Sequence, residues 1–135
     1  EHFEAFRAGT TLIYIAESQA GAMVGQVFIL LYSRNSEVAD GMHRAYLFSF
    51  RIKPAYRNQG LGSYMLAFVE EQLLRRGYSI VRLNVAQDNP KARALYERRG
   101  YEVIGYSPGI WQYQDDEGAW QTMREPAWKM LKRLR

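Results

Sequence analysis

Residues 46–77 read YLFSFRIKPAYRNQGLGSYMLAFVEEQLLRRG, and this stretch decides the fold. Its aromatic and branched start predicts a strand over Tyr46–Ile52. Pro54 has no N–H to donate to a sheet, so regular strand pairing is expected to stop there. A turn with two glycines follows, and a helix is expected from near Gly60 to Gly77. Free backbone N–H groups at the helix start predict an anion site, with phosphate as the expected anion.

The helix has an apolar face and a charged face. Apolar residues recur every three or four positions, which is typical of an amphipathic helix packed on a core. The predicted inner residues are Leu61, Met65, Phe68, Val69 and Leu73. The predicted outer residues are Glu70, Glu71, Arg75 and Arg76.

A second strand and a second helix follow this stretch. Ser79–Ala86 is expected to be a strand, and a strand, a crossover helix and a strand form a right-handed parallel unit. Asn89 and Pro90 then suit the cap and the first position of a helix over Lys91–Arg99. Gly100 ends that helix, and a further strand is predicted over Tyr101–Tyr106.

Local patterns predict the structure of the amino-terminal segments. Phe3 and Phe6 are three residues apart, so Glu1–Gly9 is predicted to be the end of a helix. Thr11–Glu17 and Met23–Tyr32 are predicted to form an antiparallel hairpin. The polar segment Ser33–His43 is predicted to be a loop.

The carboxy-terminal part is predicted to hold a hairpin and a last strand. Asp115–Gly118 is expected to be a turn between residues 111–114 and 119–122. Trp128–Leu134 is expected to be a strand, with a short basic helix as the alternative.

Composition places limits on the function. The 135 residues suit a single domain, 1–135, and 47% are hydrophobic. The chain has no cysteine and two distant histidines, so no metal site is expected. No apolar run is long enough for a membrane span, and a cytoplasmic location is the expectation. The chain starts without methionine, so an N-terminal element could be absent. The net charge of +4 arises partly from arginines at helix ends, which disfavours a nucleic-acid partner.

Two motifs, taken together, indicate a family. A Gly-x-Gly before a helix can be an ordinary turn. Here Arg57-Asn58-Gln59-Gly60-Leu61-Gly62 is followed, one strand later, by Asn89, Ala92, Tyr96 and Gly100-Tyr101 at fixed spacing. This order resembles the Arg/Gln-x-x-Gly-x-Gly/Ala and Asn-x-x-Ala-x-x-x-Tyr-x-x-x-Gly-Phe/Tyr patterns of the GCN5-related N-acetyltransferase (GNAT) superfamily.

The resemblance covers roughly residues 11–134 and implies an α+β (α/β/α) fold. Its mixed, mostly antiparallel twisted sheet contains a central, splayed parallel strand pair, and helices flank the sheet. The family's first strand and most of its first helical pair have no counterpart in this sequence.

The resemblance also implies acetyl-CoA as the cofactor. The backbone of Asn58–Ser63 would hold the pyrophosphate, Arg57 would pair with phosphate, and the pantetheine arm would pair with the strand at Phe50–Ile52. The implied cofactor-binding residues are Phe50, Arg51, Ile52, Arg57, Asn58, Gln59, Gly60, Leu61, Gly62, Ser63, Asn89, Ala92 and Tyr96.

The implied reaction is direct acyl transfer to an amine. A backbone N–H near Phe50 or Arg51 would stabilise the developing oxyanion, and Tyr96 would act as the acid. Its spacing alone favours a core aromatic on an amphipathic helix face, and only the whole motif favours the acid role. The base stays unassigned, because Tyr46 is a poor base and Glu17 or a water near Ser49 are alternatives. A non-catalytic acyl-CoA-binding module is the second hypothesis.

The acceptor is not identified beyond a small-molecule or peptide amine. The predicted hairpin carries Trp111, Tyr113 and Trp120, which could line an acceptor site, form a homodimer interface or pack in the core.

Overall fold

The computed structural model describes the backbone of residues 2–134 and the side chains of residues 9–134. Its strands are β1 (His2–Ala8), β2 (Thr11–Glu17), β3 (Met23–Leu30), β4 (Arg44–Ile52), β5 (Ile80–Ala86), β6 (Glu102–Ser107), β7 (Ile110–Gln114), β8 (Trp120–Arg124) and β9 (Ala127–Arg133). Its helices are α1 (Leu61–Arg75), α2 (Pro90–Arg98) and a short 3-10 turn, Pro54–Tyr56.

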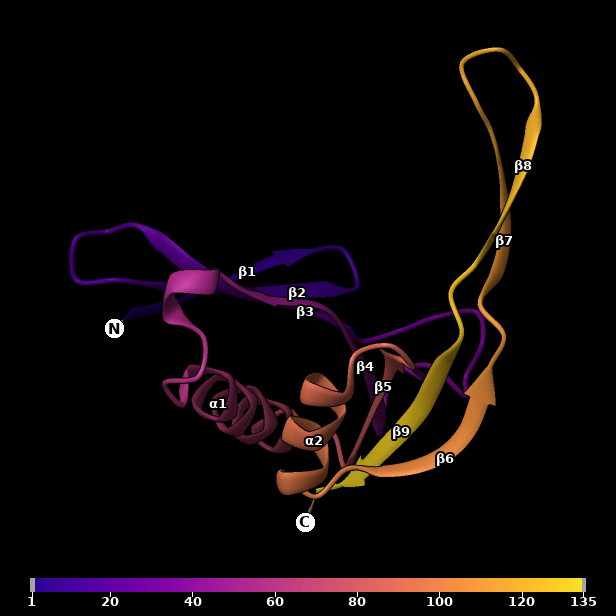
Figure 1. Ribbon diagram of the computed structural model, residues 1–135. Helices are drawn as coiled ribbons and strands as arrows, with labels where there is room; N and C mark the ends of the chain where they lie inside the picture. The colour runs from indigo at the N-terminus through magenta and orange to yellow at the C-terminus, as the bar shows by residue number, and fades with distance from the viewer. Residues whose placement is uncertain (1, 135) are drawn as a thin grey trace.

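Seven strands form one twisted sheet in the order β1-β2-β3-β4-β5-β9-β6, and β7 pairs with β8 in a separate hairpin (Figure 1). Among the described strands, β4 and β5 are the parallel pair, and the other neighbours are antiparallel. The predicted mixed, mostly antiparallel class is therefore correct. The core lies between the sheet and the helices, where Ile29, Leu73 and Leu83 are fully buried.

The parallel pair separates partway along its length. β4 pairs with β5 from Arg44 to Leu47 and continues to Ile52 beside β3 alone. The β3–β4 register shifts between Gln26 and Phe28, and Ser49, opposite this irregularity, has a φ of 49°. This bulge turns the strand, so Phe50 and Ile52 face α1 and α2. The predicted splay is confirmed.

Local signals set the ends of α1. Gly60 precedes it with a φ of 82°, which suits glycine. At the other end Gly77 has a φ of 89°, and the Tyr78 N–H donates to the Leu73 carbonyl at 2.9 Å. That bond and the one from Gly77 to the Leu74 carbonyl form a Schellman cap, so the predicted helix end is confirmed.

The cap of α2 also follows the prediction. The Asn89 Oδ1 atom accepts a hydrogen bond from the Ala92 N–H at 3.2 Å, and Pro90 occupies the first helical turn. Leu95 of α2 contacts α1 at Gly62, so both helices lie on the same face of the sheet. Within the described helices, none is long and apolar enough to span a membrane.

The prediction of a helix end at Glu1–Gly9 is wrong for the described residues. His2–Ala8 forms an edge strand that pairs with β2 from His2–Glu17 to Ala8–Thr11. The cause is a two-residue turn: Gly9 has a φ of 62°, which closes a hairpin and satisfies the backbone across the sheet. Glu1 lies outside the described residues. The last segment is the predicted strand, β9, which inserts between β5 and β6.

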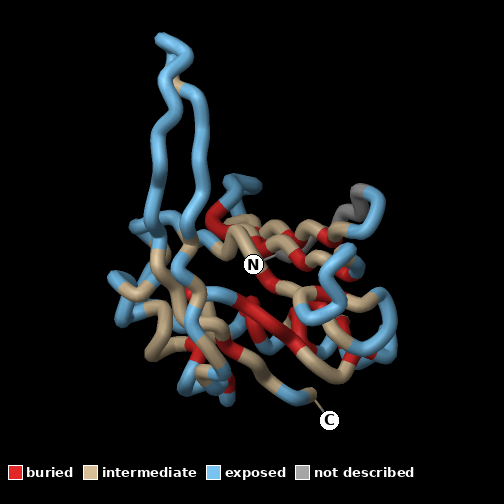
Figure 2. The backbone as a smooth tube through the Cα atoms, turned by 90° about the vertical axis from the view of Figure 1, so that its right-hand side faces the viewer, coloured by how far each residue is buried: buried red, intermediate tan, exposed pale blue. Residues whose placement is uncertain are grey.

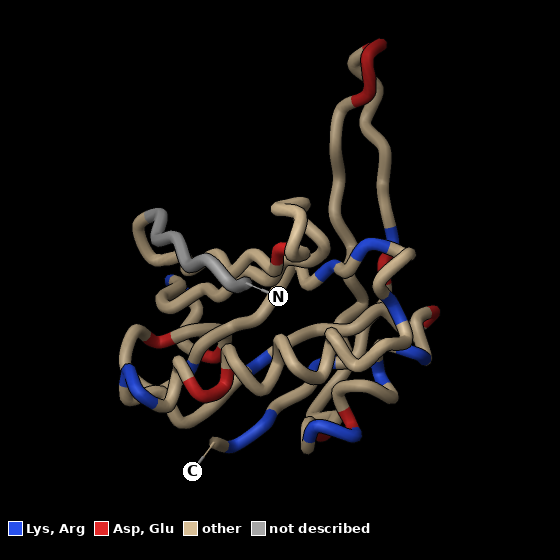
Figure 3. The backbone as a smooth tube through the Cα atoms, turned by 90° about the vertical axis from the view of Figure 1, so that its left-hand side faces the viewer, with Lys and Arg blue, Asp and Glu red and all other residues tan. Residues whose placement is uncertain are grey.

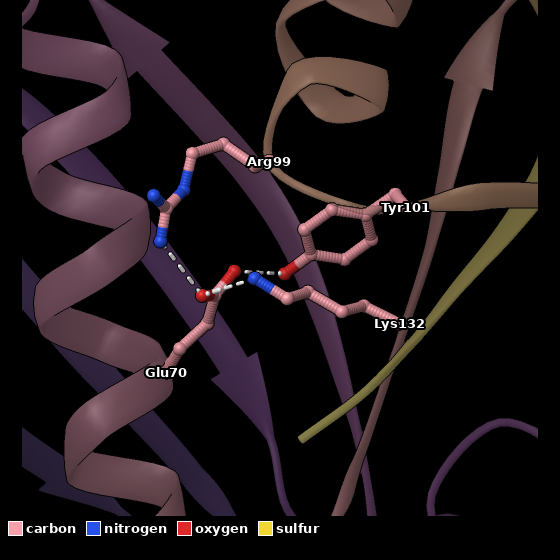
Figure 4. Close-up of polar contacts among 4 residues, drawn as sticks. All are labelled: Glu70, Arg99, Tyr101 and Lys132. Carbon is pink, nitrogen blue, oxygen red and sulfur yellow. Dashed lines mark hydrogen bonds and ion pairs between the residues drawn. The ribbon is translucent and has the colours of Figure 1, made fainter. Parts of the chain in front are cut away.

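The prediction that Glu70 points outward is also wrong. Glu70 is 6% exposed, and three side chains satisfy its carboxylate (Figure 4). The Tyr101 hydroxyl donates to Oε2 at 2.9 Å, while Arg99 and Lys132 donate to Oε1 at 3.0 and 2.8 Å. A buried charge is tolerated when it is paired and hydrogen-bonded in this way. The cluster ties α1 to the end of α2, to the residue before β6 and to β9.

Replacing Glu70 with alanine should destabilise the fold. The variant leaves two cations and a phenol without their acceptor. Because Arg99 and Lys132 are partly exposed, water can solvate them in part, so the expected loss in the free energy of unfolding is about 2 to 3 kcal/mol. Urea unfolding would measure it. Glu71→Ala is the matched control, since it removes an exposed i,i+4 pair with Arg75, and its expected loss is below about 0.5 kcal/mol. Equal losses for the two variants would contradict the structural role of Glu70.

Candidate functional site

A cavity of about 410 Å³ opens where β4 leaves β5 and lies between the starts of α1 and α2. Its walls come from the end of β4, the glycine turn and one face of α2. The lining residues are Phe50, Arg51, Ile52, Tyr56, Arg57, Asn58, Gly60, Gly62, Ser63, Asn89, Lys91, Ala92, Leu95, Tyr96 and Arg98. The cavity therefore joins the two sequence motifs, which lie about a strand and a helix apart in the chain.

Most of the predicted cofactor residues line this cavity, and two do not. Gln59 donates from Nε2 to the Ala55 carbonyl at 2.9 Å and faces an adjoining hollow with Tyr64. Leu61 also faces that hollow, and its side chain is 6% exposed because it packs into the core, as predicted.

Four lining residues were missed by the sequence analysis: Tyr56, Lys91, Leu95 and Arg98. Lys91, Leu95 and Arg98 follow the i, i+4, i+7 spacing of one helical face, so the sequence alone predicts that they point to the same side of α2. The motif residues Asn89, Ala92 and Tyr96 mark only a neighbouring part of the same helix.

The two glycines of the turn have different roles. A Cβ atom on Gly60 would meet nothing within 4 Å, so this position leaves open space beside the backbone. A Cβ atom on Gly62 would lie 3.0 Å from Leu95 Cδ2 and 3.3 Å from Ile52 Cδ1. Gly62 is thus needed for the close packing of α1 against α2 and β4. Gly60 is the position where a ligand can approach the backbone.

The start of α1 presents free donors to the cavity. The first helical hydrogen bond runs from the Tyr64 N–H to the Gly60 carbonyl at 3.1 Å. The N–H groups of the preceding helical residues therefore have no acceptor within the helix. Asn58 and Gly60 have φ values of 60° and 82°, a turn geometry that points backbone N–H groups toward one side. Such a helix start favours a bound anion.

The charge of the cavity agrees with an anionic ligand. Four of its lining side chains are cations, namely Arg51, Arg57, Lys91 and Arg98, and no carboxylate is among the lining residues described. Arg57 is partly fixed, because its Nε donates to the Ile52 carbonyl at 2.8 Å. Cations on both walls and a helix start at one end create a positive potential that a ligand with several phosphates would satisfy.

Tyr96 lies at the buried end of the cavity. Its side chain is 7% exposed, and its ring centroid lies 6.3 Å from that of Phe50 and 5.8 Å from that of Tyr101. Burial, with a smaller effect from Tyr46, raises the pKa of Tyr96 to about 12. The phenol therefore keeps its proton at neutral pH and can donate it or a hydrogen bond.

None of the three considered sources of a base lines this cavity. Tyr46 is half-buried on the opposite face of the sheet, and burial raises its pKa. The Ser49 carbonyl accepts a hydrogen bond from Gln26 at 3.2 Å. Glu17 is the last residue of β2. In the described part of the chain, no group of three or more His, Asp or Glu side chains could hold a metal ion.

Comparison with known proteins gave consistent results. Residues 1–101 match the acetyltransferase (GNAT) family. A thialysine N-epsilon-acetyltransferase from Sus scrofa is 35% identical over 114 residues, which are 84% of this chain and 62% of that protein. The Bos taurus protein of that name is 38% identical over 62% of this chain and 48% of its own length. The chain thus spans about half to three fifths of the curated relatives that it matches.

Solved structures share the fold. The ribosomal-protein-S18-alanine N-acetyltransferase from Escherichia coli superimposes with a TM-score of 0.71 at 25% identity, over 95% of this chain and 72% of that one. A GNAT family acetyltransferase from Elizabethkingia anophelis, solved with acetyl-CoA bound, gives a TM-score of 0.76 at 10% identity, over 98% and 97% of the two chains. The latter likeness concerns the fold alone.

The pKa of Tyr96 predicts a pH dependence of stability. Above pH 10 the unfolded chain ionises this phenol while the folded chain keeps it protonated, so the free energy of unfolding should fall as the pH rises from about 10 to 12. Tyr14, Tyr46 and Tyr101 have raised pKa values and should add to the fall. Urea unfolding at pH values of about 9 and 11 should show a smaller fall for Tyr96→Phe than for the wild type. An identical fall would show that Tyr96 titrates normally.

Proposed function

Because the chain belongs to the acetyltransferase (GNAT) family, we propose that it transfers the acetyl group of acetyl-CoA to a primary amine by direct attack. The observation that carries this proposal is the cavity itself. It has a β4 segment that has lost its β5 partner, cations on both walls, a helix start, and a phenol at its buried end. When bound, acetyl-CoA would supply an activated acetyl thioester.

The lining residues fit the parts of coenzyme A. The open position at Gly60 and the N–H groups up to Ser63 suit the pyrophosphate. Coenzyme A carries a 3′-phosphate in addition to the pyrophosphate. Lys91 and Arg98, which line the cavity from α2, would attract that third phosphate. The backbone of Phe50–Ile52 lacks a β5 partner and is available to the amide groups of the pantetheine arm.

Tyr96 is the proposed acid. It would donate a proton to the sulfur that leaves and would regain one, by way of solvent, from the amine nitrogen that becomes acylated, so the phenol ends the cycle in the protonated form that it has at neutral pH. A backbone N–H near Phe50 or Arg51 would donate to the carbonyl oxygen as negative charge develops there. Asn89 uses its side-chain oxygen to cap α2, so its amide NH2 is the group available to a ligand.

A small-molecule primary amine is the proposed acceptor, with a peptide amine as the alternative. The name of the curated relatives specifies the ε-amine of thialysine as their acceptor, so thialysine, lysine and polyamines belong in the first panel of amines. The hairpin aromatics Trp111, Tyr113 and Trp120 are not among the residues that line the described cavity. An acceptor role for them would therefore need a surface outside it.

Gly60→Glu should abolish acetyl-CoA binding. The substitution places bulk and a negative charge in the open space beside the turn, and the φ of 82° adds strain. Thermal unfolding with and without acetyl-CoA would measure the loss as a missing upward shift in Tm. The matched control is Gly21→Glu, because Gly21 has a φ of 84° and equally open surroundings in the β2–β3 turn, away from the cavity. Protection of Gly60→Glu by acetyl-CoA would contradict the placement of the pyrophosphate.

Tyr96→Phe should lower turnover by about 10²- to 10⁴-fold and leave the Kd for acetyl-CoA nearly unchanged, because an acid acts in the transition state. Release of free thiol with the amine panel would measure turnover. Tyr106→Phe is the control, since this tyrosine is 52% exposed on β6. Equal turnover would remove Tyr96 from the mechanism. Binding of acetyl-CoA with no thiol release for any amine would instead support the non-catalytic acyl-CoA-binding module.

A further inference from the structure

Arg82 is a buried cation on the face of the sheet opposite to the helices. Its neighbours along β5, Val81 and Leu83, belong to the core, so strand alternation directs Arg82 to the other face. Figure 2 shows that buried positions gather in the middle of the sheet, where β5 lies between β4 and β9. Arg82 is 5% exposed, although arginine is almost never buried unless it is paired. Glu70, the other buried charge of the described chain, has three side-chain partners.

Two main-chain carbonyls fix one edge of the Arg82 guanidinium. Its Nη1 donates to the Leu83 carbonyl at 3.1 Å and to the Met130 carbonyl at 3.0 Å. Its Nε and Nη2 have no acceptor among the described residues. The enclosed side-chain nitrogen without a partner in the described chain is Arg99 Nε, so Nε and Nη2 of Arg82 still reach solvent. The second edge of the guanidinium, with its fork of N–H donors, is therefore open to a ligand.

No described carboxylate forms an ion pair with Arg82. The ion pairs of the described chain use other cations. Burial lowers the pKa of Arg82, and the attraction of exposed Glu37, which lies beyond ion-pair distance, is the weakest of the effects on it. The acidic tip of the β7–β8 hairpin, residues 115–117, projects away from the sheet (Figure 3). The open fork thus lacks an anion, and an unpaired buried charge is costly.

Arg82 lies where β4 and β5 separate. Tyr46 is its register partner on β4, and Leu83, whose carbonyl anchors the guanidinium, is the last β5 residue that pairs with β4. Burial raises the pKa of Tyr96, the proposed acid, and Tyr46 raises it further, so the two phenols are close enough to interact across the split. A molecule that binds at Arg82 is therefore near the proposed acid.

Three aromatic rings extend the same face beside Arg82. The Tyr46 and Phe48 rings stack with their centroids 6.0 Å apart, and Phe28 meets Phe48 edge-on at 5.5 Å. All three side chains are partly exposed. An apolar surface next to one open cation suits a ligand that has a carbon chain and a single negative group.

We propose that Arg82 selects the acceptor and that the acceptor is an amine whose molecule also carries a carboxylate. The Nε and Nη2 edge binds both oxygens of the carboxylate, and the aromatic rings contact the carbon chain that joins it to the amine. A molecule with amines alone lacks this contact and brings only positive charge to Arg82. The inference rests on the proposed acetyl transfer and adds the feature by which one amine is chosen over another.

Lysine, lysinamide and cadaverine test the proposal on the wild type. The three share a primary amine on the same carbon chain, but the far end bears a carboxylate in lysine, a neutral amide in lysinamide and neither in cadaverine. Release of thiol from acetyl-CoA measures kcat/KM, which should be at least about tenfold higher for lysine than for the other two. Equal values for the three amines would overturn the inference and leave the acetyl-transfer proposal intact.

Arg82→Met removes the cation and keeps an unbranched side chain. The ratio of kcat/KM for lysine to that for cadaverine should fall to about threefold or less, and this ratio does not depend on the folded fraction of the variant. Arg44→Met is the matched control, because Arg44 is a cation two residues before Tyr46 whose Nη1 donates to the Glu37 carbonyl. Its ratio should stay at about tenfold or more. Equal losses for both variants would assign the preference to general positive charge and overturn the role of Arg82.

Two further outcomes separate this inference from the acetyl-transfer proposal. If Arg82→Met fails to fold, the comparison of lysine with lysinamide on the wild type decides alone. If no amine releases thiol, the acetyl-transfer proposal fails, and Tm with added lysine or cadaverine tests the carboxylate site by itself. A higher Tm with lysine alone would support the site, and equal Tm values would overturn it.

Discussion

The separation of β4 from β5 after Leu47 is the constraint on which the site depends. If β4 and β5 stayed paired to their ends, β5 would supply hydrogen-bond partners to the backbone of Phe50–Ile52 and the space between the strands would close. The bulge at Ser49 and the proline after β4 prevent this, and they turn Phe50 and Ile52 toward the helices. Where β4 turns away from β5, the chain also leads into the glycine turn before α1. The unpaired edge of β4 and the start of α1 at the cavity therefore have the same structural cause.

The cavity remains open because its two helical walls are held at a fixed separation. The Leu95 side chain of α2 contacts α1 at Gly62 and sets how closely the two helices approach. A Cβ atom at Gly62 would displace Leu95. Farther along α1, Glu70 holds the end of α2 through Arg99 and the start of β6 through Tyr101. Tyr101 in turn packs its ring against Tyr96. The buried ionic cluster thus contributes to the position of the proposed acid without lining the cavity.

The sequence predicted the features that depend on a few neighbouring residues. Gly60, Gly77 and the Asn89 cap mark helix ends because each satisfies a local backbone requirement. Features that depend on distant partners were missed. Glu70 looked like a surface charge because Arg99 and Lys132 lie 29 and 62 residues away in the chain. The first strand was missed because two phenylalanines three residues apart suggested a helix, while pairing with β2 decided the structure.

The proposed donor and the proposed acceptor would place opposite electrostatic demands on this cavity. The cavity holds four cations and no carboxylate among its described lining residues, a charge that would attract the phosphates of the proposed cofactor. A protonated amine is repelled by the same charges, by about 1 to 4 kcal/mol for each cation at close range. The nucleophile must in any case be the neutral amine. In the proposed reaction the phosphates of the bound donor would offset the four cations, so the repulsion of an amine would be strongest in the empty cavity.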